Sequence, residues 1–288
     1  MTTPQEPASS KITYFLDAEN AAEMARLMRQ DHDLTQALGG PIPEIQNMAS
    51  IHNALDIACG PGSWAFELAR TQPHISVTGF DISHLMIEYA RIQAQLQGFN
   101  NLRFLEHDAL QPLPFPDNFF DIVNARLIFG FMPSTAWPRL LRECVRVARP
   151  GGRIRLSEYE VSVSNGIYSE RMSALYTEAL RRAGKGFSPD GRHIAVLPTL
   201  GRLLRDVDCH NIQNQANIFD LSAGTEGHTH GYDNLMVLYK LVQPMLVKTG
   251  VATQDEIDIL YTQVMEEMQQ DHFCAIIFYA TFWGEVVK

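Results

Sequence analysis

The sequence contains no hydrophobic run of the roughly 20 residues that cross a bilayer as a helix, so it predicts no membrane span. The first eleven residues are polar, include two prolines and lack the apolar stretch of a signal peptide. We therefore expect residues 1–11 to form a disordered tail.

Cysteine is scarce: the four residues are Cys59, Cys144, Cys209 and Cys274. They lie far apart and form no Cys-x-x-Cys pair, so the sequence predicts neither a zinc site nor a disulfide framework. Reduced thiols and a cytoplasmic location are the simpler interpretation.

Basic residues are in the minority. The chain has 23 Lys plus Arg against 33 Asp plus Glu, a formal net charge of −10 over 288 residues. A surface of that sign repels phosphate backbones, so nucleic acid is not expected as a partner. The composition says nothing about the oligomeric state.

From about residue 53 to residue 158, short apolar runs alternate with helical patterns. The runs that predict strands are Ala54–Ala58, Ile75–Phe80, Leu102–Leu105, Phe119–Asn124 and Arg153–Ser157. The helical patterns between them are Ser63–Arg70, Ser83–Gln97 and Ser134–Ala148. This alternation predicts an α/β fold with a mostly parallel sheet and helices on both faces.

The flanking regions differ from this core. Residues 12–48 are expected to form a helical N-terminal lid, because apolar residues recur there at helical spacing. The main domain is expected to span residues 49–288, with helical cap insertions at about residues 160–200 and 222–270. Phe273–Phe282 is apolar and aromatic, as a buried strand would be.

The first strand runs into the segment Leu55–Gly62, which reads as a strand, a turn of small residues and the start of a helix. Small residues let the backbone come close to a ligand at the carboxyl end of a strand. The spacing is neither the dinucleotide G-x-G-x-x-G nor a P-loop. Taken alone, this segment is equally well explained as an ordinary tight turn.

Two acids follow the next strands. Asp81 lies about 20 residues beyond the glycine turn, where a carboxylate can bond ribose hydroxyls. Asp108 ends the third strand and can accept a hydrogen bond from an adenine amino group, with Ile82 and Met86 covering the ring. The alternatives are that Asp81 caps the following helix and that Asp108 starts a turn.

The fourth strand turns polar at Asn124 and Arg126. With it, the motifs form an ordered set: Leu55–Gly62, Asp81, Asp108-Ala109, Phe120–Arg126 and Arg149–Arg153. This set resembles the motifs of the class I S-adenosylmethionine (SAM)-dependent methyltransferases. The resemblance favours the branch of ubiquinone and menaquinone biosynthesis and bacterial small-molecule methyltransferases, and it covers mainly residues 50–160.

The resemblance implies a Rossmann-like sheet of seven strands, with the last strand antiparallel. It implies SAM as cofactor, S-adenosylhomocysteine as product and a small molecule as methyl acceptor. A helical lid and insertions after the fifth and sixth strands would build the acceptor pocket.

The family's residue roles carry over by position. Residues 56–62 would surround the methionine moiety, Asp81 would hold the ribose, and Asn124 with Arg126 would border the amino-acid tail and the methyl face. The cofactor-binding residues implied in this way are Tyr14, Asp56, Ala58, Cys59, Gly60, Asp81, Ile82, Met86, Asp108, Ala109, Asn124 and Arg126. Ala58 departs from the family's usual glycine, and we expect alanine to require ordinary backbone angles there.

In the family, the methyl group moves by direct displacement, so positioning lowers much of the barrier and a general base is modest or absent. The candidate catalytic residues are Tyr159, after the fifth strand, and His228 and His230, in a glycine-flanked segment expected to be a loop. Either histidine could act as an acid or base, or both could be solvated. As a metal pair they lack a third ligand, so no metal is expected.

Three other functions compete with methyl transfer. A SAM-binding enzyme could use the sulfonium for another reaction, which the release of S-adenosylhomocysteine would distinguish. A nicotinamide dehydrogenase is disfavoured by the missing G-x-G-x-x-G spacing. A non-catalytic scaffold of the same fold would be tested by calorimetric titration with SAM.

Overall fold

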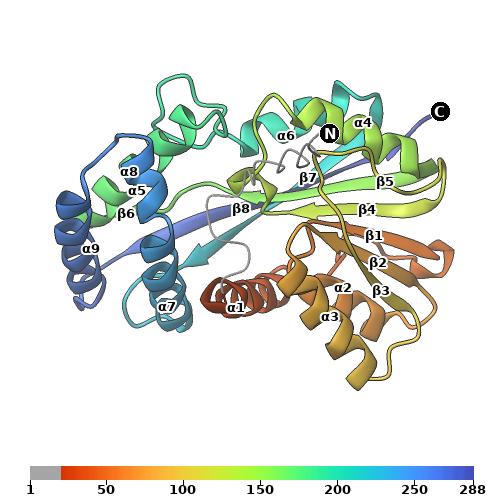
Figure 1. The fold of residues 1–288 in the computed structure, drawn as a ribbon, viewed down its shortest axis with the longest axis horizontal. Coiled ribbons are helices and arrows are strands. Elements are labelled where there is room, and N and C mark those ends of the chain that lie inside the picture. The colour runs from red at the N-terminus through yellow and green to blue at the C-terminus, as the bar shows by residue number, and fades with distance from the viewer. Residues whose placement is uncertain (1–20) are drawn as a thin grey trace, which may run out of the picture.

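The computed structural model describes residues 21–288 (Figure 1). The expected tail at residues 1–11 and the proposed lid residue Tyr14 lie outside the described residues. Within them, no helix combines the length and the apolar character that crossing a membrane requires.

A central sheet runs through the described part of the chain. Its strands are β1 (Asn53–Ile57), β2 (Ser76–Asp81), β3 (Leu102–Glu106), β4 (Phe120–Arg126), β5 (Ala148–Tyr159), β6 (Val163–Ser164), β7 (Cys209–Asp220) and β8 (Ala275–Val286). The order is β3-β2-β1-β4-β5-β8-β6, and β7 also pairs with β8. Strands β1 to β5 are parallel to one another, and β8 is antiparallel to β5.

The sheet confirms the expected α/β architecture with an antiparallel last strand, but the expected number of seven strands is wrong. The described residues form eight, because the two-residue β6 pairs with the start of β8. Two residues give no periodicity, so the sequence has no signal for such a strand.

The helices are α1 (Ala21–Ala37), α2 (Ser63–Thr71), α3 (His84–Leu96), α4 (Trp137–Val147), α5 (Ile167–Arg182), α6 (Leu197–Arg205), α7 (Glu226–Leu241), α8 (Gln243–Lys248) and α9 (Gln254–Met268). Two 3₁₀ turns, η1 (Met48–Ser50) and η2 (Ile128–Gly130), join them. In Figure 1, α2 and α3 lie beside β1 to β3. Helices α5, α7, α8 and α9 gather at the left, where β8 begins.

Neighbouring residues of the central strands serve two different cores. Ala54 belongs to the apolar cluster that contains Trp64 of α2 and Ile87 of α3. The next residue, Leu55, belongs to the larger cluster that contains Leu141 of α4. Successive side chains of a strand point to opposite faces, so helices cover both faces of β1. This double burial is why most residues of β1 and β4 are apolar.

The expected loop at residues 224–231 is wrong, because α7 begins at Glu226 and includes both histidines. The glycines serve close packing instead. A Cβ at Gly231 would lie 2.7 Å from Leu221 Cδ2, and one at Gly227 would overlap the carbonyl oxygen of Asp220. The helix can therefore start directly against the end of β7 only with glycine at these positions.

Candidate functional site

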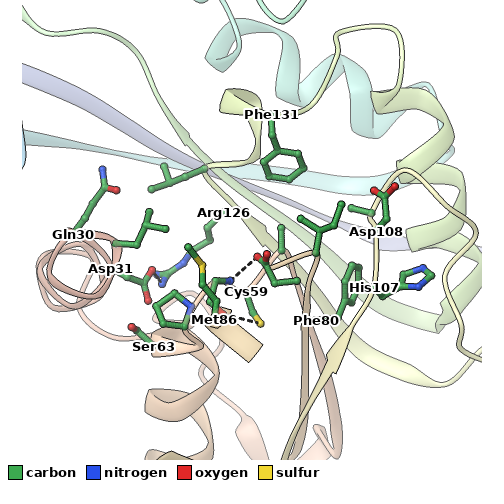
Figure 2. A pocket seen from close by; sticks show the side chains of 18 residues that line it. Gln30, Asp31, Cys59, Ser63, Phe80, Met86, His107, Asp108, Arg126 and Phe131 are labelled. Atoms are coloured by element: carbon green, nitrogen blue, oxygen red, sulfur yellow. Dashed lines mark hydrogen bonds and ion pairs between the residues drawn. The ribbon is translucent and has the colours of Figure 1, made fainter. Parts of the chain in front are cut away.

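A pocket opens at the carboxyl ends of β1, β2 and β4, beside α1 (Figure 2). Eighteen residues line about 960 Å³ of space, counting the part that is open to solvent. Carboxyl ends of parallel strands are the usual place for a ligand in an open α/β sheet. In Figure 2, Asp108 and His107 lie at one end of the pocket, and Gln30, Asp31 and Ser63 lie at the other.

The turn after β1 brings backbone to the pocket wall. Ala58 and Gly60 both have a φ of 53°, and Gly62 has a φ of 88°. A Cβ on Gly62 would lie 2.6 Å from the ring of Phe104, so only glycine fits there. Ala58, Cys59 and Gly60 all line the pocket.

The expectation that Ala58 needs ordinary backbone angles is wrong. Its φ of 53° is left-handed, a conformation that costs an L-residue about 1–2 kcal/mol. The strand-to-helix turn requires this geometry, and alanine adopts it under strain where glycine would not be strained.

We expect Ala58→Gly to stabilise the protein by about 0.5–1 kcal/mol, because relief of the left-handed strain exceeds glycine's entropic cost. Urea unfolding measures the difference. The matched control is Ala174→Gly on the exposed face of α5, which should destabilise by about 1 kcal/mol. A loss of stability in Ala58→Gly equal to that of the control would contradict the strain at Ala58.

Asp81 connects the loop after β1 to the loop after β2. Its Oδ2 accepts a hydrogen bond from the Gly60 N–H at 2.9 Å, and its Oδ1 accepts one from the Ser83 N–H at 3.0 Å. Ser83 caps α3 by accepting from the Met86 N–H at 3.2 Å. The carboxylate therefore orders the loop after β1 as well as facing the pocket.

The opposite end of the pocket is built by the loop after β3. Asp108 Oδ1 accepts from the Leu110 N–H at 2.8 Å, which fixes the carboxylate at the pocket wall. Ala109, Ile82 and Met86 line the pocket with it and supply apolar surface. A carboxylate beside flat apolar surface suits a heteroaromatic ring with an amino group.

Asp56 and Asn124 are not among the residues that line the pocket. Asp56 pairs with Asn124 in register, and Asn124 with Arg155, so the three form one row across β1, β4 and β5. Asn124 donates from Nδ2 to Asp56 Oδ1 at 2.8 Å, and Arg155 donates to Asn124 Oδ1 at 2.9 Å. Burial raises the pKa of Asp56 to about 7. The hydrogen bonds of this row link β1, β4 and β5 behind the pocket wall and so hold the strand ends in place.

Arg126 does line the pocket, and it ties α1 to β4. Its guanidinium forms an ion pair with Asp31 and donates to Thr35 Oγ1 at 2.9 Å. Burial raises the pKa of Asp31, although the neighbouring Arg126 opposes this. Figure 2 shows the two side chains meeting beside the helix that carries Asp31.

The pocket carries an acidic charge balance. Asp31, Asp81 and Asp108 face it, against the single guanidinium of Arg126, which Asp31 already neutralises. Such a lining disfavours a diphosphate and favours a ligand with positive charge and hydroxyl donors. The arrangement fits a nucleoside that carries a cation, and it argues against a dinucleotide.

The three candidate catalytic residues lie elsewhere. His228 Nδ1 lies 2.9 Å from the carbonyl oxygen of Leu221, and His230 Nδ1 lies 3.2 Å from Asp33 Oδ2. Neither histidine lines the pocket. Tyr159 lines an adjoining cavity that shares Leu27, Gln30 and Leu127 with the pocket. The catalytic roles of all three residues stay predictions.

From their positions, we expect His228→Ala and His230→Ala each to change turnover by less than about threefold, against the 10²-fold or more typical of a lost acid or base. Rates measured between about pH 6 and 9 would cover the titration of an imidazole. A fall of 10²-fold in one variant, with unchanged cofactor affinity, would instead establish a proton-transfer role.

Sequence reasoning missed several residues of the pocket wall, among them Leu27, Gln30 and Asp31 of α1 and Leu127 and Phe131 after β4. The helical spacing of residues 21–28 included Leu27 but gave no docking partner. Asp31 meets Arg126 across 95 positions of sequence, and no local pattern encodes that contact. Among the described residues, no cluster of three or more His, Cys, Asp and Glu side chains could hold a metal ion.

The known proteins that this chain resembles are methyltransferases. Residues 54–152 match the family described as "Methyltransferase domain". The chain is 30% identical over 189 residues to a demethylmenaquinone methyltransferase of Lactococcus lactis, covering 65% of this chain and 72% of that protein. It is 34% identical over 149 residues to one of Deinococcus radiodurans, covering 52% of this chain and 60% of that protein.

The matches to the Deinococcus, Thermus and Geobacillus relatives span 60%, 46% and 44% of those proteins, so the chain spans about half the length of these curated relatives. Among solved structures, a phosphoethanolamine N-methyltransferase of Haemonchus contortus bound to S-adenosylhomocysteine is similar, with a TM-score of 0.57 and 16% identity. The alignment covers 95% of this chain and 60% of that one. This likeness shows the shared fold.

Proposed function

Because this chain belongs to the class I SAM-dependent methyltransferases, we propose that it transfers a methyl group from SAM to a small-molecule acceptor. SAM is its cofactor. The observation that carries the proposal is the acidic pocket at the ends of β1, β2 and β4, which has the charge and the polar groups that a nucleoside sulfonium needs. The same lining opposes a nicotinamide dinucleotide.

The residues of the pocket divide into three roles in this proposal. Asp81 accepts hydrogen bonds from the ribose hydroxyls, while its contacts to Gly60 and Ser83 hold the loops in place. Asp108 and Ala109, with the apolar cover of Ile82 and Met86, hold the adenine. Ala58, Cys59, Gly60 and Arg126 surround the methionine moiety.

Asp56 and Asn124 act in the proposal by supporting these strand ends from behind. Tyr14, from the expected N-terminal lid, is proposed to pack over the cofactor.

When bound, SAM supplies an electrophilic methyl group on a good leaving group. The chain's own residues then need to hold the acceptor in line with that methyl and exclude water. Arg126 and Asp31 fix α1 over the pocket and so close one side of it. Tyr159 is the candidate for contacting the acceptor, through the cavity that adjoins the pocket.

The acceptor is proposed only as a small molecule. The relatives are named demethylmenaquinone methyltransferases, and a ring-bearing acceptor of that kind is compatible with the aromatic side chains near the pocket. A cytoplasmic location and the absence of a nucleic-acid partner stay predictions from the composition.

The direct test incubates the full chain with methyl-labelled SAM and a panel of small acceptors, and reads products by mass spectrometry. We expect labelled product and S-adenosylhomocysteine to appear in equal amounts. Release of S-adenosylhomocysteine is the signature that separates methyl transfer from another use of bound SAM. Binding of SAM without its turnover across a broad panel would favour the scaffold alternative.

A further inference from the structure

The cavity that contains Tyr159 adjoins the cofactor pocket. It lies between α1, the end of β5, η2, the middle of α5 and the α7–α8 segment. It spans about 510 Å³, counting the part that is open to solvent. Leu27, Gln30 and Leu127 line both this cavity and the pocket, so the two spaces meet at those side chains. We call it the acceptor chamber.

The wall of the acceptor chamber is mainly apolar and aromatic. Phe129 and Tyr159 meet edge to face, with ring centroids 5.0 Å apart. The aliphatic part of the wall is Leu238, Val242 and Met245, which come from α7, α8 and their junction and are all buried. A wall of aromatic rings and flexible aliphatic side chains packs well against a flat ring. It offers little to an extended polar chain.

The η2 turn, which forms one wall of the chamber, is held by Glu158 of β5. Glu158 Oε1 accepts a hydrogen bond from the Ile128 N–H at 2.9 Å, and Glu158 is fully buried. Burial raises the pKa of Glu158 well above its ordinary value. The wall that carries Phe129 and Gly130 is therefore anchored to β5 through Glu158.

The one charge at the chamber wall is already compensated. Arg26 donates from Nε and Nη2 to both carboxylate oxygens of Glu23 at 2.7 Å, and both side chains are buried. Its Nη1 donates to Gln30 Oε1 at 3.0 Å and to Asn234 Oδ1 at 2.9 Å. A charged ligand would enter without a counter-charge, which is costly in a buried site.

The remaining polar groups are neutral donors. Tyr159 and Tyr176 lie close enough to perturb each other, and burial raises the pKa of Tyr159 well above its ordinary value and that of Tyr176 to about 12. Both phenols are therefore protonated at neutral pH. The two hydroxyls hydrogen-bond to each other, which leaves the pair one O–H to donate to a ligand hydroxyl and oxygen lone pairs to accept from it.

We infer that the acceptor chamber binds the methyl acceptor, and that it selects an uncharged molecule with an aromatic ring and a hydroxyl group, held by Tyr159 and Tyr176. The inference rests on the proposed function. Apart from Leu127, Phe129 and Gly130, the residues that line the chamber lie outside the segment matched by the family, 54–152, so this selectivity belongs to the chain's own additions.

The test uses 4-methylphenol as the probe, titrated into the full chain saturated with S-adenosylhomocysteine. Toluene lacks the hydroxyl, and phenyltrimethylammonium and phenyl phosphate carry opposite charges. We expect 4-methylphenol to bind at least about fivefold more tightly than toluene, and tenfold more tightly than either charged probe. Tighter binding of a charged probe would overturn the inference.

Two variants locate the binding. Leu238→Trp fills the chamber and is expected to weaken 4-methylphenol binding by at least about tenfold, whereas Met236→Trp on the exposed side of the same helix should not. Changing both Tyr159 and Tyr176 to phenylalanine should abolish the preference for 4-methylphenol over toluene. Equal probe binding in Leu238→Trp and Met236→Trp would place the acceptor elsewhere.

Calorimetric titration of S-adenosylhomocysteine runs in parallel on every variant. Its affinity should stay within about twofold, because the chamber meets the pocket only at its edge. Retained affinity also shows that Leu238→Trp has folded. If S-adenosylhomocysteine fails to bind the wild-type chain, the proposed function fails. If it binds and the probes show no selectivity, only the acceptor inference fails.

Discussion

Replacing Asp81 with alanine is expected to weaken SAM binding by at least about tenfold, because a charge-assisted hydrogen bond contributes about 1.5–3 kcal/mol. In the proposed complex the ribose hydroxyls lose their acceptor. The Gly60 N–H loses its acceptor as well, since Asp81 Oδ2 now receives it at 2.9 Å. The substitution therefore removes a direct contact and also loosens the loop that surrounds the methionine moiety.

Calorimetry of the folded variant measures this effect. The control is Asp258→Ala on the exposed face of α9, which removes the same charge from the chain outside the residues that line the pocket. Its dissociation constant for SAM should match the wild type. An unchanged constant in Asp81→Ala would contradict the assignment of the β2 end to the ribose.

Arg155→Met is expected to destabilise the protein by about 3–5 kcal/mol, because removing one partner of a buried ion pair leaves the other charge unpaired. The side chain of Arg155 is 2% exposed and that of Glu44 is 5% exposed, with 2.7 Å between Nε and Oε1. Arg155 also holds Asn124, the central member of the row behind the pocket. Urea unfolding measures the loss of free energy.

Two comparisons sharpen this prediction. Arg202→Met breaks the ion pair between Arg202 and Asp206, whose side chains are 76% and 56% exposed, and should cost less than about 1 kcal/mol. The double variant Arg155→Met with Glu44→Leu removes both charges and should recover part of the loss. A cost in Arg155→Met as small as that in Arg202→Met would mean that the buried pair contributes little.

The central strands could be predicted from the sequence because double burial leaves a plain signal. The run Ala54–Ala58 corresponds to β1 at Asn53–Ile57, and Phe119–Asn124 to β4 at Phe120–Arg126. The acids that follow such strands had to reach one edge of the sheet, because parallel strands end together. Asp81 and Asp108 accordingly line the same pocket.

What could not be predicted depends on contacts between distant segments. Glycines at 227 and 231 indicated a loop in the sequence, but they permit α7 to pack against Asp220 and Leu221. The ion pair between Asp31 and Arg126 joins α1 to β4. Helical periodicity shows which face of a helix is buried, but it does not show which other element that face packs against.

Asp56 illustrates a second limit. Its place in the motif matched the family, yet its side chain belongs to the row with Asn124 and Arg155, behind the pocket wall. A motif gives the residue's position along the strand. Whether the side chain reaches the ligand depends on the pleat and on which neighbours satisfy its hydrogen bonds.

A crystal structure of the full chain with S-adenosylhomocysteine tests the central claim most directly. The account predicts the ribose hydroxyls within about 3.2 Å of the Asp81 carboxylate, the adenine beside Asp108 and Ala109, and the sulfur facing the opening at Leu27, Gln30 and Leu127. S-adenosylhomocysteine lodged in the acceptor chamber, or bound with its ribose away from Asp81, would contradict the assignment of the two spaces.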